Sequence, residues 1–365
     1  MKGLGGAVLV FLLLNLTITC HGQLRSGFYL GKCKGGNQYF NVEALIRGVV
    51  QEEFSKLPNG PTMAAALLRL QFHDCFVTGC DASLLLDGPS SEKTAFPNLS
   101  VRGYDVIDKA KAALEKACPG VVSCSDIIAV ATRDAVVLSK GLSYRVQTGR
   151  RDGFDSKKDN VNLPSPFISV KDSIAAFAAK GLNKKEMVLL LAAHTVGITH
   201  CALIRNRLYN FRNNGTRDPT MDPTLFQFLS KKCPKSDTTL GGEIALDQTP
   251  NSINVVDNGF LKQVKARKGI LEIDQGLGLD PLTAEIVRSY ADGPLSQKFR
   301  YDFGAAMIKL GGVGVLTGKN GEIRRTCNAV NNPKPLQPKP AGPTPVQPKP
   351  AGPTPKPAGL PSLGL

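Results

Sequence analysis

Cysteine content constrains this chain more than any other feature of its sequence. Nine of the 365 residues are cysteines, and Cys20 lies in an N-terminal segment of distinctive order. In that segment Lys2 precedes the apolar residues 7–16, and small and polar residues follow. This order predicts a secretory signal peptide over residues 1–22, because roughly 10 apolar residues are too few to cross a bilayer of ~30 Å. A short membrane anchor is the alternative.

The remaining cysteines are even in number. An even set behind a secretion signal predicts four disulfides formed in an oxidising compartment, although spacing alone leaves roughly a hundred pairings open. Zinc ligation is disfavoured because no CxxC pair or compact Cys/His cluster occurs. The cysteines beyond the signal are Cys33, Cys75, Cys80, Cys118, Cys124, Cys201, Cys233 and Cys327.

The composition is that of a basic globular protein. The formal net charge is +15, and 42% of the residues are hydrophobic. The chain is long enough to bury a large core, and no later segment is long and apolar enough to span a membrane. The charge favours acidic polymers or anionic surfaces as partners. We expect no nucleic-acid partner, because the sequence has no Lys/Arg block or nucleic-acid-binding motif.

Helical periodicity dominates between about residues 40 and 310. Apolar residues recur there at intervals of three and four, and strand signals are few and short, which predicts a mainly α protein. Long irregular connections are tolerated where disulfides or ions hold them. The expected helices are 40–54, 61–73, 104–116, 124–139, 170–179, 184–194, 224–232, 258–265, 281–290 and 295–309.

The composition changes abruptly near residue 331. QPKPAGPTP occurs at residues 337–345 and again at 347–355. Proline fixes φ and removes amide donors, so residues 331–365 are predicted to form an extended, basic, solvated tail outside the core. A passive spacer, a matrix attachment segment and a sorting extension are the alternatives for its role.

Histidine is scarce, which narrows the search for catalytic groups. Beyond the signal peptide it occurs only as His73, His194 and His200. Arg69 and His73 are four residues apart in LLRLQFHDC, so on a helix they project from one face. A permanent charge beside an imidazole is poorly suited to a core. The pair is therefore predicted to perform acid–base chemistry on a polarised oxygen substrate.

His194 ends an apolar run in EMVLLLAAHTVG. A single histidine on an apolar helix face is more often a hydrogen-bonded core residue than a metal ligand. From the residues alone, both interpretations stay open.

Longer segments resemble one known family. LLRLQFHDCFVTGCDASLLLD (67–87), SEKTAFPNLSVRGYDVID and AAHTVGITHC occur in the order and at distances typical of the secretory plant peroxidases, called class III haem peroxidases. The resemblance covers about residues 23–328. It implies a two-lobed haem peroxidase fold over residues 23–330, with haem b between a distal and a proximal half and four disulfides.

The resemblance assigns the distal side of the haem to Arg69, Phe72 and His73. His73 would carry a proton between the two peroxide oxygens, and Arg69 would stabilise the charge that develops as their bond breaks. Asn98, in FPNLS, would hydrogen-bond His73 and keep it basic. Asn98 also heads a glycosylation sequon, but its expected burial favours Asn214, in Asn-Gly-Thr, as the glycan acceptor.

On the proximal side, the resemblance makes His194 the axial ligand of the iron. Asp274, in ILEIDQGL, would accept the proton on the other ring nitrogen of His194 and favour high-valent iron. Pro164, in NLPSPF, matches a residue whose backbone carbonyl helps to bind aromatic donors at the haem edge.

The resemblance also implies two calcium ions, bound by oxygen ligands. The distal ion would be held by Asp74, Val77, Gly79, Asp81 and Ser83, with Val77 and Gly79 contributing carbonyls.

The proximal calcium ion would use Thr195, Asp247, Asp257 and a residue between the two acids. There the sequence is about two residues longer than the family pattern. Counting back from Asp257 selects Ser252, together with the Val255 carbonyl, whereas the local Thr-Pro selects Thr249. The sequence leaves both alternatives open.

The resemblance further implies the cysteine pairing. The expected disulfides are Cys33–Cys118, Cys75–Cys80, Cys124–Cys327 and Cys201–Cys233.

We therefore expect a haem-dependent peroxidase that reduces hydrogen peroxide to water and oxidises small phenolic donors in one-electron steps. Such activity serves lignin and wall cross-linking, phenolic oxidation or the response to oxidative stress. The protein is expected to be a secreted monomer at the cell wall, held on acidic polysaccharide by its basic surface and tail. A vacuolar address is the alternative if the tail is a sorting extension.

Two rival functions are weaker. A structural wall protein would not need the complete set of distal and proximal side chains. A catalase-like enzyme would need a tyrosine axial ligand, and none is evident.

Overall fold

The structure is a computed structural model that describes residues 24–56, 62–237 and 239–332. The predicted signal peptide and nearly all of the Pro-rich tail lie outside these residues, so both stay predictions. Contacts divide the chain into residues 1–331 and 332–365. Across the described ranges, no helix is long and apolar enough to cross a membrane.

The described chain is mainly α, as the periodicity predicts. Two short antiparallel pairs supplement the helices: β1 (Lys34–Gly35) with β2 (Gln38–Tyr39), and β3 (Ile198–His200) with β4 (Glu243–Ala245). The α-helices are α2 (Val42–Ser55), α3 (Met63–Val77), α4 (Tyr104–Ala117), α5 (Cys124–Leu138), α6 (Val170–Ala178), α7 (Lys184–Leu191), α8 (Arg205–Tyr209), α9 (Pro223–Lys232), α10 (Gly259–Lys265), α11 (Glu272–Leu279), α12 (Ala284–Ala291) and α13 (Phe299–Leu310).

Two features of the helices differ from the expectation. The helix expected to end at His194 ends at Leu191, and a 3₁₀ turn, η6 (Ala192–Thr195), carries His194 instead. The helices α8 and α11 were not expected at all. Gly276 and Gly278 lower the helix propensity of α11, which forms because Ile273 and Leu277 are buried.

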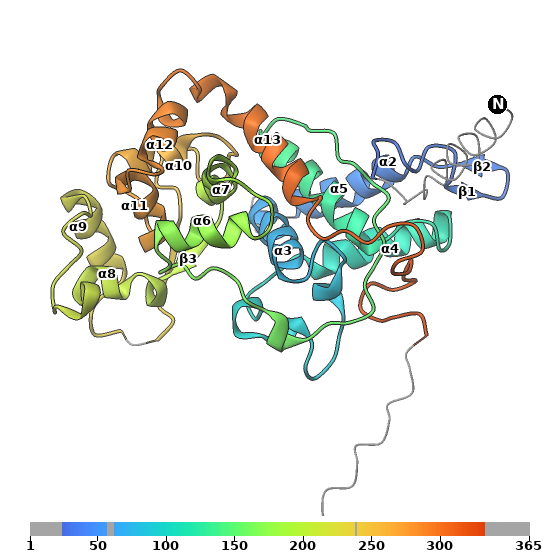
Figure 1. The fold of residues 1–365 in the computed structure, drawn as a ribbon, viewed down its shortest axis with the longest axis horizontal. Coiled ribbons are helices and arrows are strands. Elements are labelled where there is room, and N and C mark those ends of the chain that lie inside the picture. The colour runs from blue at the N-terminus through green and yellow to red at the C-terminus, as the bar shows by residue number, and fades with distance from the viewer. Residues whose placement is uncertain (1–23, 57–61, 238, 333–365) are drawn as a thin grey trace, which may run out of the picture. The chain divides into compact units, whose positions relative to one another are not determined.

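Helix α3 belongs to two apolar cores. Leu67 and Leu70 pack in the core built largely from α2, α4 and α5, while Leu68 and Phe76 pack in the core built largely from α7 and α10 to α13. Figure 1 shows α2, α4 and α5 gathered on one side of α3, and α6 to α12 on the other. Because both flanks of α3 are covered, its sequence lacks a strong polar stripe. Helix α3 therefore joins the two halves.

Four disulfides close the described chain. They join Cys33–Cys118, Cys75–Cys80, Cys124–Cys327 and Cys201–Cys233, the same pairs that the family resemblance implies.

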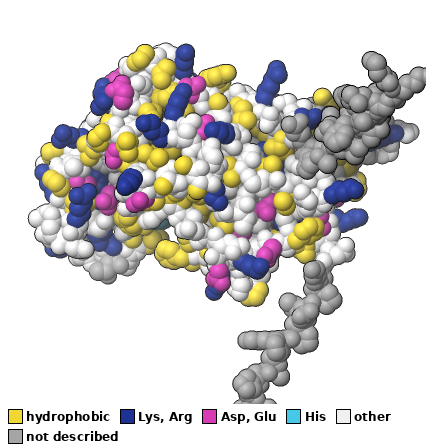
Figure 2. Space-filling model, viewed as in Figure 1, with side chains coloured by type: hydrophobic (Ala, Val, Ile, Leu, Met, Phe, Trp, Pro, Cys, Tyr) yellow, Lys and Arg dark blue, Asp and Glu magenta, His cyan; other side chains and the backbone are white. Residues whose placement is uncertain are grey.

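Basic side chains are dispersed on the surface. Figure 2 shows Lys and Arg scattered over the visible face among Asp and Glu, without one continuous basic block.

Candidate active site

Arg69 and His73 lie one turn apart on α3, as their spacing requires. Arg69 Nε donates to His73 Nε2 at 3.1 Å, and Arg69 Nη2 donates to the Pro97 carbonyl at 2.9 Å. Arginine has donors only, so the Nε2 atom of His73 must be the acceptor. The proton of a neutral His73 therefore resides on Nδ1.

Asn98 fixes that tautomer. Its Oδ1 lies 2.6 Å from His73 Nδ1, and its Nδ2 donates to the Glu92 carbonyl at 2.8 Å. Asn98 is 2% exposed, which agrees with its expected burial, whereas Asn214 is exposed. The Nε2 atom of His73 is thus the unprotonated ring nitrogen, and in this structure its lone pair accepts the hydrogen bond from Arg69.

The electrostatic surroundings keep His73 neutral. Burial, reinforced by the charge of Arg69, lowers the pKa of His73 to about 4, and the Asn98 hydrogen bond opposes this only in part. At neutral pH the ring is therefore a proton acceptor.

His194 is held by a buried carboxylate. Its Nδ1 lies 2.8 Å from Asp274 Oδ1, and Asp274 Oδ2 accepts from the Leu271 N–H at 3.1 Å. The Asp274 side chain is 0% exposed, but that of His194 is 28% exposed. A histidine enclosed in a core would not be exposed to this degree. With Nδ1 engaged, Nε2 is the nitrogen that can bind a metal.

The two histidine-bearing segments are adjacent. Helix α3 contacts η6, and a Cβ at Gly197, just after His194, would lie 2.9 Å from Ala65 Cβ on α3. The aromatic ring of Phe72 is partly buried and packs 4.8 Å from that of Phe76, centroid to centroid. Partly exposed apolar side chains on α3 and an imidazole on η6 suit an apolar, metal-bearing prosthetic group such as haem.

Pro164 lies in the irregular segment before α6. It is partly buried, and the neighbouring Phe167 is 43% exposed. Its role in binding donors stays a prediction.

The predicted distal calcium ligands lie around the turn that follows α3. Thr78 Oγ1 lies 3.2 Å from Ser83 Oγ, Ser83 N donates to Asp81 Oδ1 at 3.0 Å, and Asp81 N donates to the Gly79 carbonyl at 2.8 Å. The Val77 carbonyl accepts from Lys180 Nζ at 2.8 Å.

Three buried carboxylate oxygens near this turn lack hydrogen-bond partners. One oxygen of Asp74 and both oxygens of Glu92 are buried without a hydrogen bond. Burial, followed by the charges of Asp81 and Glu92, raises the pKa of Asp74 well above its usual range. Burial is also the main cause that raises the pKa of Glu92 to about 7. A cation would relieve this crowding of negative charge, so the residues fit calcium.

The predicted proximal ligands also converge. Thr195 Oγ1 lies 3.2 Å from Asp247 Oδ2, 3.1 Å from the Val255 carbonyl and 3.4 Å from Asp257 Oδ1. A Cβ at Gly259 would lie within 3.0 Å of Asp247, Asp257 and Thr249 oxygens.

Both alternatives for the remaining proximal ligand lie at this cluster. Ser252 Oγ donates to Asp257 Oδ2 at 2.7 Å, and Thr249 Oγ1 accepts from Gln263 Nε2 at 3.1 Å.

In the part of the chain that the structure describes, no three His, Cys, Asp or Glu side chains form a group that could hold a metal. This is compatible with the predicted calcium sites, because each has only two carboxylates. Hydroxyl and carbonyl oxygens supply the other predicted ligands.

Comparison with known proteins gives a consistent result. A family model described as peroxidase matches residues 46–293. Peroxidase 60 of Arabidopsis thaliana is 50% identical over 330 residues, which cover 89% of this chain and 96% of that protein. Peroxidase 57 of the same plant is 47% identical, covering 91% and 100%. Peroxidase N1 of Nicotiana tabacum is 40% identical, covering 89% and 96%.

Proposed function

Because this chain belongs to the secretory plant peroxidases, haem enzymes that reduce hydrogen peroxide and oxidise phenolic donors, we propose that Arg69, His73 and His194 perform that chemistry here. When bound, haem supplies the redox chemistry: peroxide removes two electrons, and two donor molecules return them one at a time. His194 Nε2 is the proposed iron ligand, and Phe72 contributes to the distal wall.

The proposed role of His73 is to move one proton. Its Nε2 accepts the proton from the inner oxygen of the peroxide and delivers it to the outer oxygen, which then leaves as water. Asn98 holds the ring in the tautomer that this transfer needs. Arg69 stabilises the negative charge that develops on the departing oxygen, and it stays charged throughout.

A shared arrangement carries the proposal: Asn98 holds Nδ1 of His73, and Asp274 holds Nδ1 of His194. Each Nε2 is thereby kept unprotonated in the neutral ring: that of His73, which accepts from Arg69 Nε at 3.1 Å, is the proposed base, and that of His194 is the proposed ligand. The pull of Asp274 on the Nδ1 proton makes the His194 ring a stronger donor to iron.

Stopped-flow mixing with hydrogen peroxide tests this assignment. His73→Leu is expected to slow peroxide cleavage by roughly 10²- to 10⁴-fold while the haem spectrum is retained. His200→Leu is the matched control and should react at the wild-type rate. An unimpaired His73→Leu protein would refute the assignment.

We also propose two bound calcium ions. The distal ion is assigned to Asp74, Asp81, Ser83 and the carbonyls of Val77 and Gly79, and the unpartnered carboxylate oxygens support this. The proximal ion is assigned to Thr195, Asp247, Asp257 and one hydroxyl.

That hydroxyl comes from Thr249 or Ser252. Metal analysis of Thr249→Val and Ser252→Ala decides between them, because only the variant that lacks the ligand should release the second calcium ion.

The remaining proposals concern donor, partners and place. Pro164 is assigned to donor binding, and Asn214 is proposed to carry a glycan. The protein is proposed to act as a secreted monomer at the cell wall, where its net charge of +15 favours acidic polysaccharide. Retention on a polygalacturonate column that salt abolishes would support this partner, and passage through the column at low salt would contradict it.

A further inference from the structure

A fully buried arginine lies close to the His194–Asp274 pair. Arg207 belongs to α8, is 0% exposed, and donates from Nε to Asp218 Oδ2 at 2.9 Å. Burying a guanidinium costs free energy that its partners must offset. The other acceptors of this side chain therefore show what the buried charge holds in place.

One nitrogen of Arg207 binds three successive carbonyls. Nη1 donates to those of Gly269, Ile270 and Leu271, at 2.7, 2.6 and 3.2 Å. These residues come directly before α11, the helix that carries Asp274. A single charged group thus fixes the backbone that leads into this helix.

Leu271 connects Arg207 with the His194–Asp274 pair. Its carbonyl accepts from Arg207 Nη1, while its N–H donates to Asp274 Oδ2 at 3.1 Å. The other carboxylate oxygen, Oδ1, lies 2.8 Å from His194 Nδ1. A continuous series of contacts therefore runs from the buried guanidinium to the imidazole ring.

We propose that Arg207 is a positioning residue that sets the strength of the His194–Asp274 hydrogen bond by holding residues 269–271. The inference rests on the proposed role of His194 as the iron ligand. If these residues shift, Asp274 pulls less strongly on the Nδ1 proton, and the imidazole becomes a weaker donor. Ferric iron is then stabilised less relative to ferrous iron.

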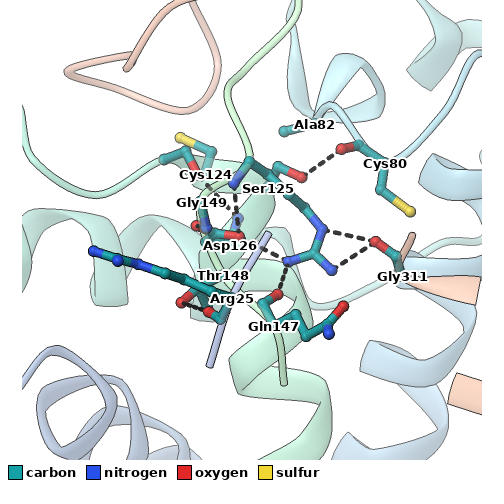
Figure 3. A network of polar contacts seen from close by, with 12 residues as sticks. Arg25, Cys80, Ala82, Cys124, Ser125, Asp126, Gln147, Thr148, Gly149 and Gly311 are labelled. Atoms are coloured by element: carbon teal, nitrogen blue, oxygen red, sulfur yellow. Dashed lines mark hydrogen bonds and ion pairs between the residues drawn. The ribbon is translucent and has the colours of Figure 1, made fainter. Parts of the chain in front are cut away.

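The chain offers a matched control in its other half. Arg150 is 2% exposed and, like Arg207, binds one aspartate and backbone carbonyls. Arg150 Nη1 donates to Asp126 Oδ1 at 2.8 Å and Nε donates to the Gly311 carbonyl at 2.8 Å. Figure 3 shows the polar network to which Asp126 and Gly311 belong. No contact of Arg150 reaches residues 269–274 among the described residues. A change at Arg150 therefore measures the loss of stability from disturbing a buried arginine, without an effect on residues 269–274.

The experiment compares Arg207→Lys with Arg150→Lys in the full-length haem protein. The readouts are thermal unfolding, the ferric/ferrous midpoint potential, and the iron–imidazole stretching band of the ferrous protein. Both variants should lose stability, since one ammonium cannot replace a guanidinium fork. Only Arg207→Lys should lower the stretching frequency and shift the potential to a more positive value.

Gly269→Ala provides a second route that changes no charge. Its Cβ would lie 2.7 Å from Gln275 N and 3.1 Å from the carbonyl carbon of Asp274, so it displaces the first turn of α11 directly. Gly269→Ala should also lower the stretching frequency and shift the midpoint potential to a more positive value, even if Arg207→Lys does not fold.

Two outcomes overturn the inference: unchanged stretching frequency and potential in the Arg207 and Gly269 variants, or equal shifts in Arg150→Lys. Failure of the proposed function looks different. If His194 is the iron ligand, the iron–imidazole band of the wild-type protein should disappear in His194→Gly and return when imidazole is added. If the proposed function is wrong, the wild-type protein would not show such a band.

Discussion

His73 is the residue whose environment makes the clearest pH prediction. Its pKa is lowered to about 4, mainly by burial and then by Arg69, so Nε2 can accept a proton at any pH well above 4. A calcium ion at Asp74 would add positive charge and act in the same direction. The rate of peroxide cleavage should therefore be flat from about pH 5 to 8 and fall roughly tenfold per unit below pH 4.

Asn98→Asp is the matched variant for this pH profile. It keeps the Oδ1 acceptor but adds a negative charge beside the ring, which raises the pKa of His73. The acid limb in stopped-flow measurements should move up by about one unit or more. A wild-type limb near pH 6.5, the ordinary histidine value, would contradict the lowered pKa.

The sequence predicted the site residues that lie in local motifs. It did not predict those whose contacts come from distant parts of the chain. Arg69 and His73 share one helical turn, so their spacing predicts that they meet. Glu92 and Arg207 carry no such signal. The charge of Glu92 contributes to the raised pKa of Asp74. Arg207 donates to backbone carbonyls more than sixty residues away in the chain. Only the tertiary fold creates these contacts.

Among the elements, the packing of α3 against the turn after His194 is a close contact that can be tested. Gly197 has φ +97°, and a Cβ there would lie 2.9 Å from Ala65 Cβ. Gly197→Ala should destabilise the protein by about 1–3 kcal/mol through backbone strain, with the contact adding to it.

Ala65→Gly separates these two causes. It removes the contact but not the strain, so the double variant should be more stable than the sum of the single changes predicts, by at least about 0.5 kcal/mol. Urea unfolding of the four proteins supplies the comparison. Strict additivity would show that the α3 contact is not tight.

Periodicity predicted the long helices because each covers a core, yet it could not resolve how they end. Helix α7 has a clear start, since Asn183 and Glu186 form a capping box, whereas its end changes to a 3₁₀ turn at His194. His194 on that turn contacts Asp274, which is 80 residues away in the chain, so the local sequence does not encode this contact. Helix α11 was not predicted because Gly276 and Gly278 have low helix propensity, which the burial of other residues in the helix outweighs.

For the whole molecule, the pairing of cysteines could not be derived from spacing and came from the family resemblance. The pairing matters because the disulfides span very different lengths. Cys124–Cys327 closes a separation of 203 residues, whereas Cys201–Cys233 closes only 32. The long one fastens the C-terminal end of the described chain to the start of α5.

Chain entropy then predicts how unequal these bonds are. A cross-link restricts the unfolded chain more when the closed loop is longer, so Cys124→Ala/Cys327→Ala should cost about 1.5 kcal/mol more than Cys201→Ala/Cys233→Ala. Alanine is the suitable replacement because all four cysteines are buried and a serine hydroxyl would lack a partner. Urea unfolding of both double variants, with equal haem and calcium loading, measures the difference. An equal loss in the two proteins would mean that unfolded-chain entropy is not what the long disulfide contributes, and that its local packing at the start of α5 decides its effect.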